Sequence, residues 1–87
     1  MNEAPWFVYI IQTVKNRYYT GITTDVDRRF QEHLGVLSRG AKFFRSDKPD
    51  KIVYLETCLT RSEALVKEAQ IKKLSRVQKE NFIKAQK

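Results

Sequence analysis

The run Trp6–Thr13 constrains the fold of this chain more than any other segment. Its sequence, WFVYIIQT, is rich in β-branched and aromatic residues, and both of its alternating faces are apolar. A strand with one face in water would show polar residues at every second position. We therefore predict a central β-strand that is covered on both faces.

The remaining segments predict a small α+β fold. A polar turn at Val14–Arg17 leads to a second strand at Tyr18–Thr23, and a third strand is predicted at Ile52–Thr57. Helices are predicted at about 26–36, at about 61–74 and after Ser75, each behind a capping sequence such as Thr60–Glu63. The order β-β-α-β-α-α indicates a three-stranded, mainly antiparallel sheet that is flanked by helices.

Chain length and composition narrow the class of protein. Eighty-seven residues suffice for one hydrophobic core, so we expect a single domain over 1–87. The longest apolar stretch, Trp6–Ile11, is too short to span a bilayer, and the N-terminus does not resemble a signal peptide. Cys58 is the only cysteine, which excludes an intrachain disulfide and a zinc site built from cysteines. We expect a cytoplasmic protein with no membrane association and no obligate protein partner.

The net charge indicates the kind of partner. Seventeen Lys and Arg against ten Asp and Glu give a formal charge of +7. Six bases and one acid fall within 72–87, and five bases and two acids fall within 39–51. Clusters of this kind are typical of proteins that contact nucleic-acid phosphates. A solvated basic surface would give the same composition, so the charge alone leaves both explanations open.

Glu68 is unusual because of its position on the helix predicted at about 61–74. The apolar face of that helix is mapped by Ala64, Leu65, Ala69 and Ile71. Glu68 falls in the middle of this face, where an ionised carboxylate costs several kcal/mol unless a cation or strong hydrogen bonds compensate. An ion pair with Lys72 is one compensation, and a divalent metal is the other, since a lone carboxylate with open water positions suits Mg²⁺.

The first predicted helix carries a polar pair, Arg29 and His33. They are four residues apart and should lie together along the edge of an apolar stripe. The stripe consists of Val26, Phe30, Leu34 and Leu37. The pair is either solvated beside the core or directed at one anionic group. Arginine offers a planar fork of donors to phosphate oxygens, and histidine exchanges protons near neutral pH.

Two tyrosine triplets lie on the predicted hairpin, Val8-Tyr9-Ile10 and Tyr19-Thr20-Gly21. A phenol is a hydrogen-bond partner and, with help, a proton acceptor, although strand tyrosines also serve as packing residues. The glycine leaves a place where another backbone or a ligand can approach closely. Together with the arginine, histidine and glutamate above, the tyrosines complete a set of residues suited to phosphodiester hydrolysis.

This set, in this order, resembles the GIY-YIG nuclease superfamily, and most of all its short stand-alone bacterial branch. The two triplets stand where the family has GIY and YIG. Arg29 matches the arginine of the following helix, His33 the frequent histidine, and Glu68 the metal-binding glutamate. The resemblance covers about 6–83, and the segment Gly40-Ala41-Lys42 with Arg45 and Pro49 is similar to one that precedes the third strand in this branch.

The triplets depart from the family pattern at two positions. The first triplet lacks its glycine, and Thr20 replaces the isoleucine or valine of the second. Neither change removes a catalytic side chain. The assignment therefore depends on the spacing of the triplets to Arg29, His33 and Glu68.

The resemblance implies a metal-dependent endonuclease that hydrolyses phosphodiester bonds of DNA, with RNA left open, in repair or recombination. A single Mg²⁺ or Mn²⁺ would be held by Glu68, and Arg29 would bind a non-bridging phosphate oxygen. Tyr9 or Tyr19 would accept a proton from the attacking water, with His33 in support. Flanking phosphate contacts are expected from Lys42, Arg45, Lys72 and Lys73.

Two other functions fit the same residues. The first is a nucleic-acid-binding module on this fold that does not cleave, whose affinity would depend on salt and would not respond to loss of Glu68. The second is a protein–protein adaptor that uses the Phe43-Phe44 pair, which we expect to be exposed in the basic connector Ser38–Asp50.

Overall fold

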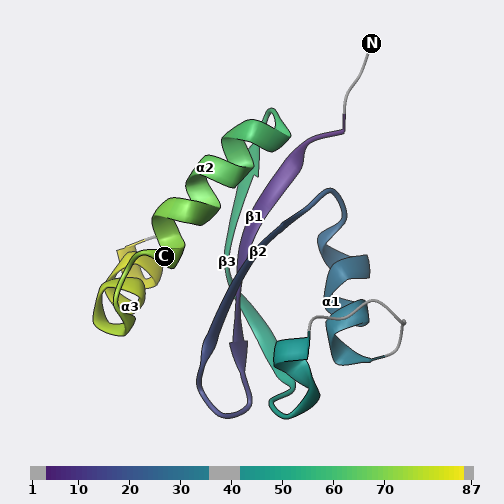
Figure 1. The fold of residues 1–87 in the computed structure, drawn as a ribbon, viewed down its shortest axis with the longest axis vertical. Helices are drawn as coiled ribbons and strands as arrows, with labels where there is room; N and C mark the ends of the chain where they lie inside the picture. The colour runs from purple at the N-terminus through teal and green to yellow at the C-terminus, as the bar shows by residue number, and fades with distance from the viewer. Residues whose placement is uncertain (1–3, 36–41, 86–87) are drawn as a thin grey trace.

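The computed structural model describes residues 4–35 and 42–85 of the chain (Figure 1). The elements are β1 (Trp6–Thr13), β2 (Tyr18–Thr23), α1 (Val26–Leu34), the 3-10 helix η1 (Lys42–Arg45), β3 (Pro49–Cys58), α2 (Arg61–Lys72) and α3 (Arg76–Ala85). The three strands form one antiparallel sheet in the order β2-β1-β3. The predicted α+β class and element order are confirmed. None of the helices in these two ranges is long and apolar enough to cross a membrane.

The central strand β1 is covered on both faces, as its composition predicts. Val8 and Ile10 pack on one face together with residues of α2 and α3. Tyr9 and Ile11 pack on the other face with Phe44 of η1. These four side chains of β1, Val8 to Ile11, are each at most 2% exposed. Figure 1 shows α2 and α3 on one side of the twisted sheet and α1 on the other, so each face has its own apolar cluster.

Helix ends and strand ends differ by a few residues from the predicted ones. α1 ends at Leu34 because Gly35 adopts a left-handed φ of 88° and its N–H closes the last turn. α2 ends at Lys72, before the predicted Leu74. β3 begins at Pro49 and ends at Cys58, beyond both predicted ends, because its pairing with β1 continues past an irregularity in the register. The predicted end of the first helix near 36, Leu37, and the Gly40-Ala41 pair lie outside the described residues.

Side-chain caps begin each of the three α-helices. The Asp25 carboxylate accepts from the Arg28 N–H at 3.1 Å, and the Thr60 hydroxyl accepts from the Glu63 N–H at 3.1 Å. At α3 the exchange is reciprocal, because the Ser75 hydroxyl accepts from the Gln78 N–H and the Gln78 side chain accepts from the Ser75 N–H. The three helices therefore begin at the predicted capping sequences.

A buried carboxylate ties the β1–β2 turn to the segment before β3. Asp47 is 1% exposed and accepts from the Thr13 hydroxyl at 2.6 Å, from the Lys15 N–H at 3.0 Å and from Arg17 Nε at 2.8 Å. Burial alone would raise the pKa of Asp47, but these hydrogen bonds and the arginine charge hold it below its usual value. The carboxylate is therefore ionised, and it fixes the hairpin turn relative to η1.

Candidate active site

Tyr9 and Tyr19 lie on the same face of the sheet. Tyr9 pairs with Gly21 across the two strands and Ile11 pairs with Tyr19, so the tyrosines are diagonal neighbours. Their ring centroids are 6.4 Å apart. Tyr9 is 2% exposed, and Tyr19 is half-buried. The predicted hairpin does place the two phenols side by side, on the face that α1 covers.

Gly21 makes room for the Tyr9 side chain. A Cβ atom at Gly21 would lie 2.4 Å from the Tyr9 hydroxyl oxygen and 2.7 Å from Tyr9 Cζ, both far inside van der Waals contact. The close approach that a strand glycine allows is therefore made by the tyrosine of the first triplet. This explains physically why the two triplets occur together, since the phenol of the first lies across the glycine of the second.

His33 is the buried residue of α1, which corrects its predicted place beside the core. It is 3% exposed, whereas Val26, Phe30 and Leu34 of the predicted stripe are only half-buried. The helix turns His33 towards the sheet because that side chain has partners there. Its Nε2 lies 3.0 Å from the Tyr9 hydroxyl, and its ring lies 4.4 Å from Phe44 and 5.2 Å from Tyr19 between centroids.

The surroundings of His33 favour its neutral form. Burial lowers the pKa of His33, and the positive charge of Arg29 lowers it further, while Glu32 opposes the shift. The resulting pKa is about 4. At neutral pH the imidazole is therefore uncharged, and one of its two nitrogens can accept a hydrogen bond.

We expect the imidazole of His33 to titrate near pH 4 in an NMR measurement, which is unambiguous because the chain contains one histidine. The unfolded chain takes up this proton near pH 6.5, so folding stability should fall by on the order of 3 kcal/mol as the pH drops from 6.5 to 4. A His33→Gln variant should lose this pH dependence in thermal unfolding. A midpoint near 6.5 in the folded protein would contradict the burial of the ring.

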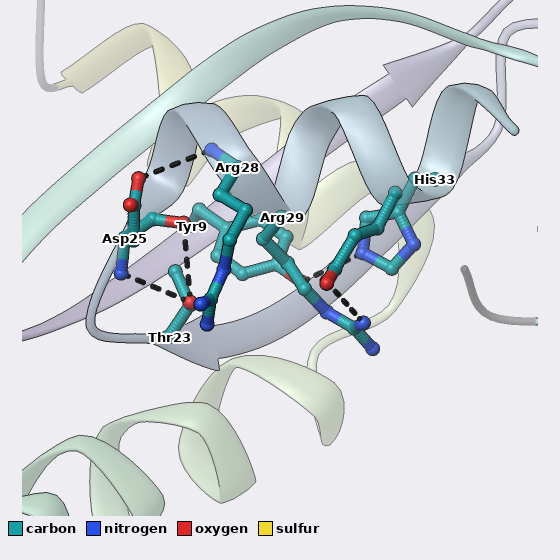
Figure 2. A network of polar contacts seen from close by, with 7 residues as sticks. Tyr9, Thr23, Asp25, Arg28, Arg29 and His33 are labelled. Carbon is teal, nitrogen blue, oxygen red and sulfur yellow. Dashed lines mark hydrogen bonds and ion pairs between the residues drawn. The ribbon is translucent and has the colours of Figure 1, made fainter. Parts of the chain in front are cut away.

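Arg29 connects the histidine and the tyrosine. Its Nη1 donates to the Glu32 carboxylate at 2.9 Å. Burial opposes the charge of Arg29, but its interactions with Glu32 and Tyr9 outweigh burial and raise the pKa of the guanidinium. Figure 2 shows Tyr9, Arg29 and His33 beneath α1, beside the cap formed by Thr23, Asp25 and Arg28. The Arg29 side chain is 29% exposed, so it is accessible to a ligand.

Glu68 lies on the buried face of α2, as predicted, but the face has different members. Ala64 and Ile71 are buried, whereas Leu65 is 37% exposed and Ala69 is also exposed. The face that contacts the sheet follows the i, i+4, i+7 positions Ala64, Glu68 and Ile71, so Glu68 is more central than the predicted apolar arc suggests. Its side chain is 18% exposed.

The alternative of an ion pair at Glu68 is realised in the structure. Lys72 Nζ lies 3.5 Å from the Glu68 carboxylate, but the lysine side chain is 57% exposed, so the pair contributes little. The charge of the carboxylate also acts on Tyr9. Burial raises the pKa of Tyr9 most, Tyr19 adds to this, Arg29 lowers it, and the negative charge of Glu68 raises it again. The helix that carries Glu68, α2, packs against β1 and β2, the two strands that carry the tyrosines.

The donor set around Glu68 fits a metal that is held only partly by the protein. Within residues 4–35 and 42–85, no three His, Cys, Asp or Glu side chains gather into a metal cluster. A lone carboxylate is enough for Mg²⁺, which usually keeps several waters and completes its shell with substrate phosphates. Glu68 therefore suits Mg²⁺ or Mn²⁺ that arrives with a nucleic acid.

The predicted phosphate contacts fall into two groups. Lys42 and Arg45 are exposed on η1, whose Phe43 and Phe44 rings pack against Tyr19 at 5.4 Å and 4.8 Å. Lys72 and Lys73 are exposed at the end of α2 that follows Glu68. Both groups therefore lie on elements that also carry or contact site residues.

The predicted exposure of the aromatic pair is wrong. Phe44 is 2% exposed and Phe43 is half-buried, because both rings pack on the tyrosine face of the sheet. This removes the surface on which an adaptor function would depend. Sequence reasoning also missed Asp47 and Arg17. The only feature of the sequence that points to Asp47 is that it is an acid inside a basic connector.

The sequence and the fold match a known family. The family model of the GIY-YIG catalytic domain matches residues 5–81. The chain belongs to the GIY-YIG family. A nuclease-type catalytic activity and a nucleic-acid substrate follow from this membership.

Short bacterial proteins are among the relatives of the chain. The UPF0213 protein DP2720 of Desulfotalea psychrophila is 46% identical over 97% of this chain and 76% of its own length. The UPF0213 protein YhbQ of Escherichia coli K12 is 43% identical over 92% of this chain and 78% of its own length. These relatives agree with the resemblance of the sequence to the stand-alone branch.

Two solved structures share the fold. The solution structure of the UPF0213 protein BH0048 from Bacillus halodurans is 36% identical, with a TM-score of 0.60 over 93% of this chain and 84% of that one. The solution structure of EF2693 from E. faecalis is 32% identical, with a TM-score of 0.64 over 97% of this chain and 88% of that one. Both confirm the α+β architecture.

Proposed function

We propose that this protein is an endonuclease that hydrolyses DNA phosphodiester bonds with the help of one Mg²⁺ or Mn²⁺, on substrates of repair or recombination. One observation supports this most. The buried Tyr9 hydroxyl lies 3.0 Å from a neutral imidazole nitrogen of His33, and the neighbouring Arg29 guanidinium acts to lower the pKa of this phenol. A phenol that only packs needs one partner, whereas a phenol that passes a proton needs a donor on one side and an acceptor on the other.

In the proposed direction of proton transfer, the Tyr9 hydroxyl donates to Nε2 of His33, which accepts in the tautomer that carries its proton on Nδ1. The positive charge of Arg29 supports this direction, because it stabilises negative charge on the Tyr9 oxygen. As the attacking water adds to phosphorus, its proton passes to the Tyr9 oxygen while the Tyr9 proton passes to Nε2. Tyr9 remains a phenol throughout, which matters because burial raises its pKa and disfavours the phenolate. Burial and the charge of Arg29 disfavour the imidazolium, so His33 holds this proton only briefly and gives it up again.

Arg29 has a second task at the phosphate. Its half-buried guanidinium is held by Glu32 and so presents a fixed positive charge beside the Tyr9 hydroxyl. A non-bridging oxygen bound there becomes more negative as water adds, and the fixed donors stabilise that charge without reorganising. Arg29 therefore binds the transition state more strongly than the ground state.

Glu68 would hold the metal, and Lys42, Arg45, Lys72 and Lys73 would bind flanking phosphates. The metal supplies charge neutralisation at the scissile phosphate and at the departing 3′-oxygen. Lys72, which pairs weakly with Glu68, can move to a phosphate at small cost because it is exposed. Tyr19 packs against His33 and keeps that ring in place.

The experiment that tests this function is cleavage of supercoiled plasmid and of a branched duplex with Mg²⁺. Glu68→Ala and Arg29→Ala should each lower the rate roughly 10²-fold or more, because each removes charge stabilisation of the transition state. Glu80→Ala and Arg76→Ala are the matched controls, since they break an ion pair of the same type on α3.

Unchanged cleavage in both site variants would disprove the assigned site. A wild-type protein that binds duplex in a salt-dependent manner but never cuts would favour the alternative, a binding module that does not cleave.

A further inference from the structure

We infer that Arg17, oriented by the buried Asp47 and stacked on Phe43, is a preformed contact for a backbone phosphate of the nucleic acid near the cleaved bond. The inference depends on the proposed function only for the identity of the ligand. Neither the triplets nor the family pattern assigns a role to this arginine.

The Arg17 guanidinium is held on two sides. Its Nε lies 2.8 Å from the Asp47 carboxylate, and its Cζ lies 4.5 Å from the centre of the Phe43 ring. The side chain is nevertheless 49% exposed. Because one donor is used by Asp47, the two terminal nitrogens retain four N–H groups, which match a phosphate in a bidentate manner. A half-exposed arginine with this orientation can bind an anion without first losing its side-chain freedom.

Asp47 is the reason that the orientation is fixed. Its carboxylate is buried and also accepts from the Thr13 hydroxyl and the Lys15 N–H, so it cannot follow the arginine into solvent. An exposed carboxylate would move with its partner and would leave the guanidinium free to rotate. A buried acid inside a basic connector is therefore explained by the cation that it orients.

The arginine lies beside the candidate active site. Phe43, which it covers, is 5.4 Å from the Tyr19 ring, and Tyr19 is 5.2 Å from the His33 ring. Lys42 and Arg45 belong to the same 3-10 helix as Phe43 and are exposed. A DNA strand that places one phosphate at Arg29 would therefore next meet the positive charges of Arg17, Lys42 and Arg45, on the side of Tyr19 and η1.

The chain contains a close match for Arg17 on the other face of the sheet. Arg76 Cζ lies 5.0 Å from the centre of the Tyr18 ring, its Nε is 3.5 Å from the Glu80 carboxylate, and its side chain is 45% exposed. Arg17 and Arg76 are thus nearly equal in charge, in ring stacking and in exposure. The two arginines differ in the burial of the carboxylate and in proximity to the site, so Arg76 serves as the control.

The test measures binding of a fluorescent DNA duplex by anisotropy, in a Glu68→Ala background and across a salt series. Arg17→Gln, which keeps an N–H for Asp47, should weaken binding about tenfold and lower the salt slope by about one. Arg76→Gln should change neither quantity. Asp47→Asn should weaken binding although it makes the protein more positive, because the arginine is no longer oriented.

Three outcomes would overturn the inference: wild-type affinity and slope in Arg17→Gln, an equal loss in Arg76→Gln, or tighter binding by Asp47→Asn. Thermal unfolding checks that each variant is folded. If Asp47→Asn does not fold, the comparison of Arg17→Gln with Arg76→Gln tests the inference by itself. Because this assay does not measure cleavage, a protein that binds through Arg17 but never cuts would contradict only the proposed function.

Discussion

Replacement of Tyr9 by phenylalanine should lower the rate of DNA cleavage by roughly 10² to 10⁴-fold, the contribution of a positioned proton-transfer group. The ring stays in the same apolar cluster, so packing is retained. The hydroxyl is lost, and with it the oxygen that hydrogen-bonds to His33 Nε2. The effect should appear in kcat, because the missing step occurs in the transition state, and KM for the DNA should change little.

The matched control for this variant is Tyr54→Phe. Tyr54 is also a buried tyrosine whose pKa is raised, first by burial and then by its hydrogen bond to the Glu56 carboxylate. It belongs to the apolar cluster on the other face of the sheet. Each variant loses one hydroxyl hydrogen bond, at a cost of about 1 kcal/mol in thermal or chemical unfolding. Equal cleavage rates in the two variants would show that the Tyr9 hydroxyl carries no proton.

Replacement of Gly21 by alanine should abolish most cleavage although alanine adds a single methyl group. The new Cβ would lie 2.4 Å from the Tyr9 oxygen, and the ring cannot move away freely because Tyr9 is 2% exposed. Overpacking of this kind costs about 1 to 3 kcal/mol of stability. The displaced hydroxyl leaves His33 Nε2, so the loss of activity should be at least as large as in Tyr9→Phe.

Gly35→Ala is the control for loss of a glycine. Gly35 has a φ of 88°, so alanine costs about 1 to 2 kcal/mol through the backbone, but nothing lies within 4 Å of the added atom. This variant should be destabilised and still cleave at the wild-type rate once folded. NMR of His33 provides a second measurement, since its signals should shift in Gly21→Ala and not in Gly35→Ala. If folded Gly21→Ala cleaves at the wild-type rate, the expected clash between the new methyl group and the Tyr9 ring is wrong.

Much of the fold could be predicted from local pattern. The two apolar faces of Trp6–Thr13 identified the central strand, and the caps at Thr60 and Ser75 identified the starts of two helices. These signals are local, since they depend on side-chain period and on hydrogen bonds within a few residues. Ends that depend on partners were less accurate. β3 extends to Pro49 only because β1 is present to pair with it.

The candidate site was predicted as a set of residues, not as an arrangement. Spacing selected Tyr9, Arg29, His33 and Glu68, and family membership is now shown for the chain. Helical projection put His33 at the edge of a stripe, and the polar connector around Phe43-Phe44 suggested an exposed pair, but His33 and Phe44 are buried. Projection treats a helix alone, whereas burial is decided by the partner surface. Here that surface is polar and aromatic, so a histidine fits it better than the apolar stripe does.

The sequence by itself determined which strands and α-helices form, that both faces of β1 are apolar and which residues are available for chemistry, because these properties depend on neighbours along the chain. Only the tertiary structure decided that the Tyr9 phenol crosses Gly21 to reach His33, that the charge of Glu68 acts on Tyr9, and that Asp47 holds Arg17. Each of these interactions joins residues that are far apart in the sequence. Their geometry comes from strand register and helix packing, for which no local pattern carries the information.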